Sequence, residues 1–413
     1  MHTTQTAGEA TSSRAVFRRD VTSAVLFVGA MHGVWRLFDF IAYRNLGASE
    51  IWIGVIATAG YYGYIWNLFL NRVTARLSLR RGIVAIMLAS ACLLIVAGWQ
   101  TAAIPYCLLI ITVALLHGLY EVQYGTLVRH LYGRDERPRL LSRRFLAISA
   151  TTIGTALLFG AICRASGRHL EAFLLAAVPM IAAALVFRGI PTRDDHPMEP
   201  FRAHEVLRTV IRDTRLRRVL IVLLFYGWIG AGMRPILTVQ FERLGFDEAQ
   251  VGQLVAFGTA GMLLALLVVT PRLRFAGGVT NFRLCFGAAS LAMLVYLAVA
   301  CGVPDSWSMP LMAIGGFLFG GSFAVFGIAM QTTGINLAPP GCTTLYVNAI
   351  MIVIGVRGMI MPLVSAEVVK LWGVRTAITV SVIVSCGCLV IAMIPGIDGT
   401  EPPSDLPRGR RSR

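Results

Sequence analysis

The chain has 413 residues, of which 56% are hydrophobic and only 14% are charged. Soluble domains carry about 25% charged residues, and this chain instead repeats apolar runs of about 20 residues, enough to cross a bilayer as helices. A formal net charge of +16 would suit nucleic-acid binding. The arginines, however, stand in short clusters between the apolar runs, as topology signals do. We therefore predict an all-α integral membrane protein that contacts the lipid bilayer and has no nucleic-acid partner.

The apolar runs predict twelve transmembrane helices in two pseudo-symmetric six-helix bundles. The first bundle spans residues 21–189 and the second spans residues 218–395. The individual helices are expected near residues 21–43, 50–71, 82–101, 104–129, 143–163, 169–189, 218–241, 249–270, 281–302, 308–331, 343–367 and 374–395. Residues 190–217 form an arginine-rich connector, and the polar ends 1–20 and 396–413 are expected to be disordered tails.

The positions of the arginines predict the orientation of the chain in the membrane. Most of the 37 Lys and Arg residues fall in alternate loops and in the tails, and cytoplasmic loops retain such residues. We therefore expect both termini, the 190–217 connector and the 129–143 loop to be cytoplasmic, and a bacterial inner membrane is the expected location. Termini on the same side also require an even number of crossing helices.

An internal duplication supports the two-bundle organisation. The segment LGASEIWIGVI from Leu46 recurs as LGFDEAQVGQL from Leu244, and at the same offset Arg36 matches Arg234. Two copies in the same membrane orientation, six helices apart, predict parallel repeats related by an axis along the membrane normal.

The chain resembles the major facilitator superfamily over about residues 20 to 395. That family carries a motif of the form G-x-x-x-D-R-x-G-x-R between its second and third helices, and Asn71–Arg80 reads NRVTARLSLR here. Arg76 and Arg80 match, whereas the two glycine places and the acidic place differ. The stretch DERPRLLSRR (Asp135–Arg144) is also similar to the family's loop after the fourth helix. The resemblance implies secondary transport by alternating access, with a gating role for Arg76 and Arg80.

Charged side chains within the membrane are costly, at roughly 3 kcal/mol each, and usually face a cavity or a partner. Two helices of the first bundle each present such residues on one face. In transporters that this chain resembles, both helices line the central cavity. We predict that the proton is the coupling ion and that the coupling residues are His32, Asp39, His117 and Glu121. The alternatives are histidines that stay neutral, bonded within the bundle, and an Arg36–Asp39 ion pair that only fixes packing. An Arg36–Glu121 pair also stays open.

A substrate site is predicted from arginines and aromatic residues at membrane depth. Arg36 and Arg234, at matching places in the repeats, are expected to clamp an anionic group, since guanidinium offers paired donors. The predicted substrate-binding residues are Arg36, Tyr61, Tyr62, Tyr120, Arg234 and Arg357. The alternatives are arginines that cap carbonyls or pair with acidic neighbours, and tyrosines that pack between helices. The glycine-rich segment GGFLFGG (Gly315–Gly321) is expected to allow close helix packing.

No catalytic motif, phosphate-binding glycine loop or metal-spaced cluster is found, so no enzyme activity, cofactor or metal is expected. The cysteines are expected to serve packing. The predicted function is secondary transport of a small organic solute, anionic or zwitterionic, with the oligomeric state open. The rival hypotheses are an assembly factor of the same fold that does not transport, and an exporter of lipophilic drugs or lipids.

Overall fold

The computed structural model describes residues 7–74, 79–132, 136–166, 169–190, 203–269, 278–338 and 343–393, and every regular element in them is helical. Ten helical segments in these ranges are long and apolar enough to cross a membrane. One of them lies within α15 (Thr343–Met393), which is broken at Gly373, where φ is 81°. That segment is therefore two helices, which brings the number to eleven. The twelfth is α3 (Glu50–Thr74), a helix of 25 residues that packs beside α15. The described residues thus contain the twelve predicted crossing helices.

The first half begins with one long crossing helix whose dihedral angles stay helical through two π-helical turns. It consists of α1 (Ala7–Ala24), η1 (Val25–Gly29), α2 (Ala30–Phe40) and η2 (Ile41–Asn45). The other crossing helices of this half are α3, α4 (Leu79–Gly98), α5 (Ala103–Leu131), α6 (Arg137–Ser166) and α7 (His169–Arg188).

The second half repeats this plan. Its first crossing helix is interrupted at residues 231–232, between α9 (Thr214–Gly230) and α10 (Met233–Arg243). Pro235 explains the interruption, because proline has no N–H to continue the hydrogen-bond ladder. The remaining elements are α11 (Glu248–Leu264), η3 (Ala265–Val269), α13 (Gly278–Cys301), α14 (Asp305–Leu337) and α15.

One expectation about the segments outside the bundles differs from the structure, and the connector contains a helix that was not predicted. The first helix begins at Ala7, within the stretch 1–20 that we expected to be a disordered tail, because its alanines and arginines favour helix and continue the crossing helix. The connector 190–217 contains α8 (Ala203–Arg212), which buries Val206. Residues 396–413 lie outside the described residues.

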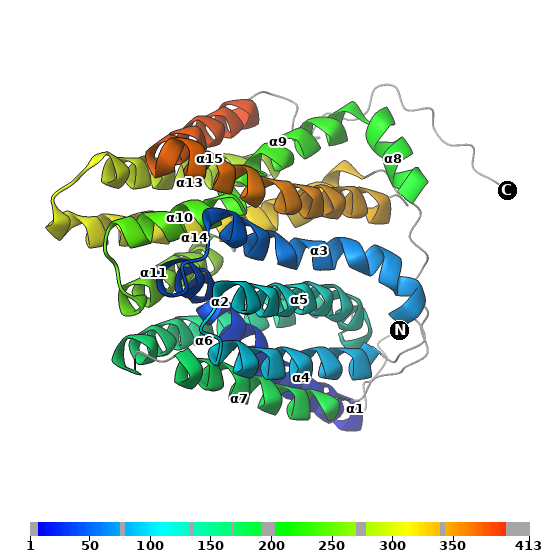
Figure 1. Cartoon of the computed structure of the whole chain (residues 1–413). Helices are drawn as coiled ribbons and strands as arrows, with labels where there is room; N and C mark the ends of the chain where they lie inside the picture. Colours follow the sequence, from blue (N-terminus) through cyan, green and yellow to red (C-terminus); the bar gives the residue numbers. More distant parts are fainter. Residues whose placement is uncertain are drawn as a thin grey trace.

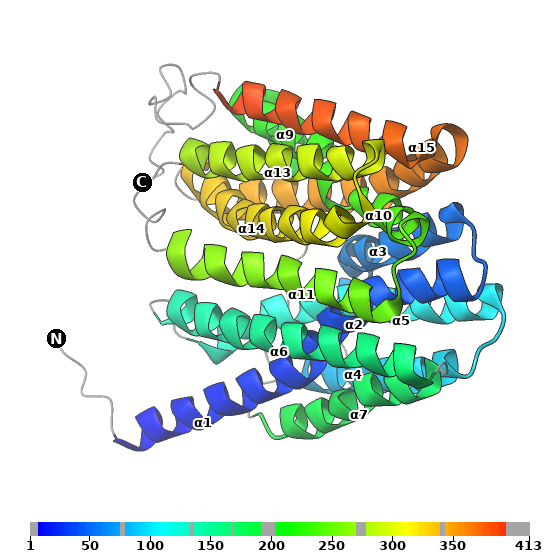
Figure 2. The same cartoon turned by 90° about the vertical axis from the view of Figure 1, so that its left-hand side faces the viewer.

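The two halves stack on each other, with α4, α5, α6 and α7 in the lower layer of Figure 1 and α9, α13, α14 and α15 in the upper one. Figure 2 shows α11 lying next to α6 across the boundary between the halves, in agreement with their contacts. Within the second half, α11 and α14 approach closely at glycines. A Cβ added to Gly320 would lie only 1.8 Å from the carbonyl oxygen of Gly258. The predicted role of the glycine-rich segment in close packing is therefore confirmed.

The duplicated sequence corresponds to a duplicated turn. Gly47 has φ of 67° and Gly245 has φ of 71°, a left-handed conformation that favours glycine. Each glycine stands three residues before a helix, which starts at Glu50 in one copy and at Glu248 in the other. The same chain reversal therefore occurs in both halves, and both copies lie at the end of the bundle that appears on the left in Figure 1.

Three tryptophans mark the membrane boundary at this end. Trp99 follows α4, Trp307 lies in the first turn of α14, and Trp372 precedes the break in α15; each is at least 60% exposed. Indole rings concentrate at the interface between hydrocarbon and water. These residues therefore form one arc of an interfacial aromatic belt.

Candidate functional site

One end of the bundle is closed by polar contacts between the halves, and we name it the sealed end; it is formed by residues 44–50 and 243–248 together with Arg164 and His169. The Asn45 side chain donates to Glu248 Oε1 at 2.9 Å. The Arg44 guanidinium donates to the carbonyl of Phe246, and Arg164 lies 3.3 Å from Asp247. Every one of these contacts joins the first half to the second, so the halves cannot separate at this end without breaking them.

Closer to the middle of the membrane, a buried ion pair also bridges the halves. The Arg234 guanidinium donates through two nitrogens to the carboxylate of Asp39, with the Nη2–Oδ1 distance 2.9 Å. Arg234 also donates to the Trp35 carbonyl at 3.2 Å and lies over the Trp35 ring. The Asp39 side chain is fully buried. We name this pair the latch, because it is the strongest class of hydrogen bond and joins α2 to α10.

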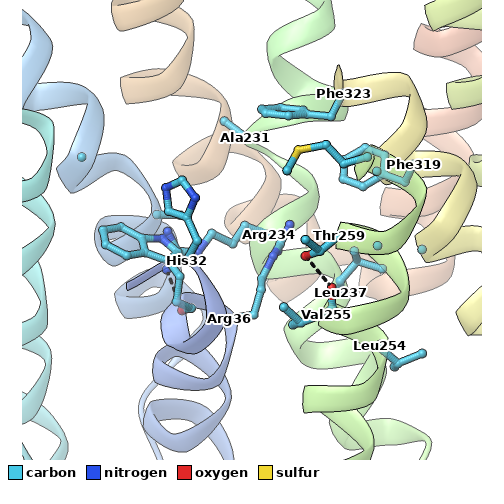
Figure 3. Close-up of a pocket in the computed structure, with 18 of the residues that line it drawn as sticks. His32, Arg36, Ala231, Arg234, Leu237, Leu254, Val255, Thr259, Phe319 and Phe323 are labelled. Atoms are coloured by element: carbon cyan, nitrogen blue, oxygen red, sulfur yellow. Dashed lines mark hydrogen bonds between the residues drawn. The ribbon is translucent and has the colours of Figure 1, made fainter. Parts of the chain in front are cut away.

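A cavity of about 420 Å³ lies between the two halves. Figure 3 shows His32, Arg36 and Arg234 on one side of it, facing Thr259, Phe319 and Phe323 on the other. The first half contributes mostly polar and aromatic side chains, whereas the wall from the second half is mostly apolar. The lining residues from α10, α11 and α14 include Leu237, Leu254, Val255, Met262, Phe319 and Phe323. The cavity can therefore hold an organic molecule with one polar and one apolar side.

Arg36 differs from Arg234 and Arg357 in that a buried guanidinium nitrogen, Nη1, has no hydrogen-bond partner in the described part of the chain. Arg36 lines the cavity. The local Arg36–Asp39 pair considered from the sequence is not formed, because Asp39 bonds to Arg234 instead. A charged donor that is buried without an acceptor is costly.

His32 and His117 come together from different helices at the wall of the same cavity. Their ring centroids are 5.4 Å apart, and His117 Nε2 lies 3.8 Å from Glu121 Oε1 on the next turn of α5. His117 Nδ1 is buried without a partner among the described atoms. Ligating atoms of all three residues lie within 4.8 Å of one another. No metal site was expected from the sequence. The only local signal for this cluster is the spacing of four residues between His117 and Glu121, which places both on one face of α5.

The other predicted site residues have protein partners or lie away from the cavity. Arg357 donates to the Leu223 carbonyl at 2.7 Å and stacks on two aromatic rings. Tyr61 lines the cavity and also packs against Gly358 in α15, whereas Tyr62 is not among the lining residues. Arg80 donates to the Ile190 carbonyl. Arg76 lies outside the described residues.

Tyr120 belongs to a buried polar cluster in the first half that sequence reasoning did not identify. Its hydroxyl accepts from Arg144 at 3.0 Å. Arg144 lies 3.7 Å from Asp20, whose carboxylate accepts from Tyr124 at 2.7 Å and from Tyr132. The cluster ties α1, α5 and α6 together, and its partners are too far apart in sequence for periodicity to pair them.

Solved structures of the same fold are transporters by their titles. A nucleoside transporter, NupG, shares 14% identity with a TM-score of 0.69, covering 92% of this chain and 97% of that one. A POT family transporter in complex with 5-aminolevulinic acid shares 11% identity with a TM-score of 0.74, covering 92% and 94%. The human organic anion transporter MFSD10 shares 15% identity with a TM-score of 0.65, covering 92% and 99%. These likenesses show the fold.

Sequence comparison defines the family. No curated protein sequence matches the chain. The family profile described as Major Facilitator Superfamily matches residues 22–356, a range that covers most of the chain, from the first crossing helix into α15. This protein therefore belongs to the Major Facilitator Superfamily.

Proposed function

We propose that this protein is a secondary active transporter that moves a small organic anion or zwitterion across the membrane by alternating access. The observation that carries the proposal is Arg36, a half-buried residue at the wall of a cavity between the two halves, whose buried Nη1 has no hydrogen-bond partner among the described residues. A guanidinium nitrogen without an acceptor at membrane depth is costly, and a ligand carboxylate or phosphate would offset this cost through paired hydrogen bonds.

The shape and lining of the cavity support an organic solute over an inorganic anion. The volume of about 420 Å³ falls in the range of small-molecule sites. Trp35 and Tyr61 line the wall that the first half of the protein contributes, and Phe319 and Phe323 line the cavity from α14. Arg36 would hold the anionic group while these rings contact the apolar part of the solute. From the sequence we expected Arg36 and Arg234 to bind the anionic group together. In this proposal only Arg36 binds it, because Arg234 is paired with Asp39.

The arrangement of the contacts between the halves supports alternating access. In this conformation the sealed end and the latch hold the halves together on one side of the cavity. Transport requires a second conformation in which Asn45–Glu248 and the latch are broken and this end opens, by rocking of one half against the other.

Proton coupling is assigned to Asp39. Protonation of its carboxylate removes the charge that binds Arg234, so proton binding and opening of the latch are linked. Replacing Asp39 by Asn should abolish uphill accumulation of the solute while leaving exchange down its gradient. Accumulation that persists in Asp39→Asn would remove the coupling role from this residue.

A ligand screen by thermal shift tests the proposed substrate class. Purified protein is heated with separate pools of anionic, zwitterionic, cationic and neutral metabolites; a ligand at 100 times its Kd stabilises the folded state by about 2.7 kcal/mol. We expect stabilisation only by anionic or zwitterionic pools, and its loss in Arg36→Gln. Equal stabilisation of the wild type and Arg36→Gln, or stabilisation by cationic compounds alone, would contradict the proposal. Arg80→Gln, away from the cavity, is the matched control.

The cavity, with an Arg36 nitrogen that bonds to no described residue, also favours transport over the rival hypothesis of an assembly factor without transport. For such a protein we expected a dry interior in which all charges are paired. The largely apolar second-half wall fits the organic part of an anion. The apolar wall is therefore no argument for the other rival hypothesis, an exporter of lipophilic drugs or lipids.

A further inference from the structure

We infer that His32, His117 and Glu121 form a binding site for a divalent transition-metal ion, such as Zn²⁺, in the wall of the central cavity. The inference goes beyond transport of an organic anion. It depends on the proposed function only for the identity of the fourth ligand.

The geometry of the three side chains is the first support. Their ligating atoms lie within 4.8 Å of one another, and His117 Nε2 is already 3.8 Å from Glu121 Oε1. Metal–ligand bonds of about 2.0–2.1 Å in a tetrahedral site place ligand atoms about 3.4 Å apart. The difference is small enough for side-chain rotation to close, since Glu121 is one-third exposed and His32 is exposed to the cavity.

The second, independent support is an unsatisfied buried nitrogen. The His117 side chain is nine-tenths buried, and its Nδ1 has no hydrogen-bond partner within the described ranges. Tyr120 stacks on the imidazole ring at 6.0 Å, and the Trp35 ring lies 5.4 Å from it. These aromatic neighbours hold the ring in place. A buried imidazole fixed in this way, with hydrogen-bonding capacity unused, is suited to coordinate a metal or to orient a ligating nitrogen.

The donor set selects the kind of ion. Two imidazole nitrogens and one carboxylate favour Zn²⁺, Co²⁺ or Ni²⁺, whereas Ca²⁺ and Mg²⁺ prefer sites made of oxygen ligands. Three protein ligands leave one coordination position open, as in zinc sites that bind an exchangeable molecule. Because His32 faces the cavity, the open position also faces it.

The balance of charge indicates what fills the open position. Glu121 neutralises one of the two charges of the metal, and Arg36, one helical turn from His32 on α2, adds a further positive charge. Arg144 is nearby but is balanced by Asp20. The cavity would then carry an excess of positive charge, so an anionic oxygen of the solute is the expected fourth ligand. The solute would bind to the metal and to Arg36 together.

Titration of the purified, tag-free protein with Zn²⁺ tests the site. We expect one Zn²⁺ per chain in the wild type, and an affinity at least about 100-fold lower in each of His32→Ala, His117→Ala and Glu121→Gln, since even outer-shell changes cost about 10- to 100-fold. His169→Ala, a histidine change at the sealed end, is the matched control and should keep full binding.

X-ray absorption of the zinc-loaded wild type makes the test independent of how well the variants fold. A first shell of two nitrogens and light oxygen ligands near 2.0 Å is expected. Absence of a stoichiometric site in the wild type, unchanged affinity in folded variants, or a shell containing sulfur from the free cysteines would overturn the inference. The titration uses the metal alone, so its failure would leave the anion site at Arg36 to be judged by the ligand screen.

Discussion

Arg36 and Arg234 occupy matching places in the two repeats, but only the replacement of Arg234 by Met should destabilise the protein. Arg36→Met removes a buried donor group whose Nη1 has no partner, which costs the folded state about 1–3 kcal/mol. The variant should therefore be as stable as the wild type or more stable. Arg234→Met leaves the fully buried carboxylate of Asp39 without its partner, a change that costs about 3–5 kcal/mol.

Thermal unfolding in one detergent measures both variants against the wild type. We expect the melting temperature of Arg36→Met to equal or exceed the wild-type value and that of Arg234→Met to fall clearly. Adding Asp39→Asn to Arg234→Met should recover part of the loss, because the stranded charge is removed. The reasoning would be refuted if Arg36→Met were as destabilising as Arg234→Met, since Arg36 would then have a structural partner that this conformation does not contain.

Three further predictions follow from contacts elsewhere in the molecule. Arg164→Ala should change the melting temperature little, because exposed ion pairs contribute only about 0–1 kcal/mol; a large loss would show that this contact is essential to the sealed end. Gly320→Ala should sharply reduce the yield of monodisperse protein on gel filtration, because its Cβ would overlap the Gly258 carbonyl, whereas Gly327→Ala, with open space around it, should behave as the wild type. An impermeant maleimide added to intact cells should label Cys301, which is exposed at the sealed end, but not a cysteine placed at position 195; the reverse pattern would invert the proposed orientation.

The fold could be predicted from sequence because its main signals are local. Runs of apolar residues, arginine clusters and the repeated turn around Gly47 and Gly245 each act over a few residues, and the twelve crossing helices follow from them. The predicted family is likewise confirmed. The amphipathic connector helix α8 was missed because a ten-residue helix between polar segments has too few apolar positions to stand out.

The candidate site could be predicted only in part, because helix periodicity gives the face of a residue but not its partner. His32, Arg36 and Asp39 were placed on one face of the first helix; in the structure His32 and Arg36 line the cavity, whereas Asp39 bonds to Arg234. The partner of Asp39 is Arg234, distant in sequence, and only packing of the halves decides between it and the nearer Arg36. His32 and His117 lie on different helices, so helix periodicity could not predict that their rings are neighbours or that they could bind a metal together.

The central claim is that the two halves rock apart at the sealed end when the latch between Asp39 and Arg234 is released. Spin labels on cysteines at Glu171 and Asp305 would report this motion, because both residues are exposed near the sealed end, one in each half. Pulsed electron paramagnetic resonance on the cysteine-depleted protein measures the distance between them. We predict one short-distance population when Asp39 is present, and a second, longer-distance population when it is replaced by Asn, which resembles the protonated acid. A single short distance that is unchanged in the Asn variant would contradict the account.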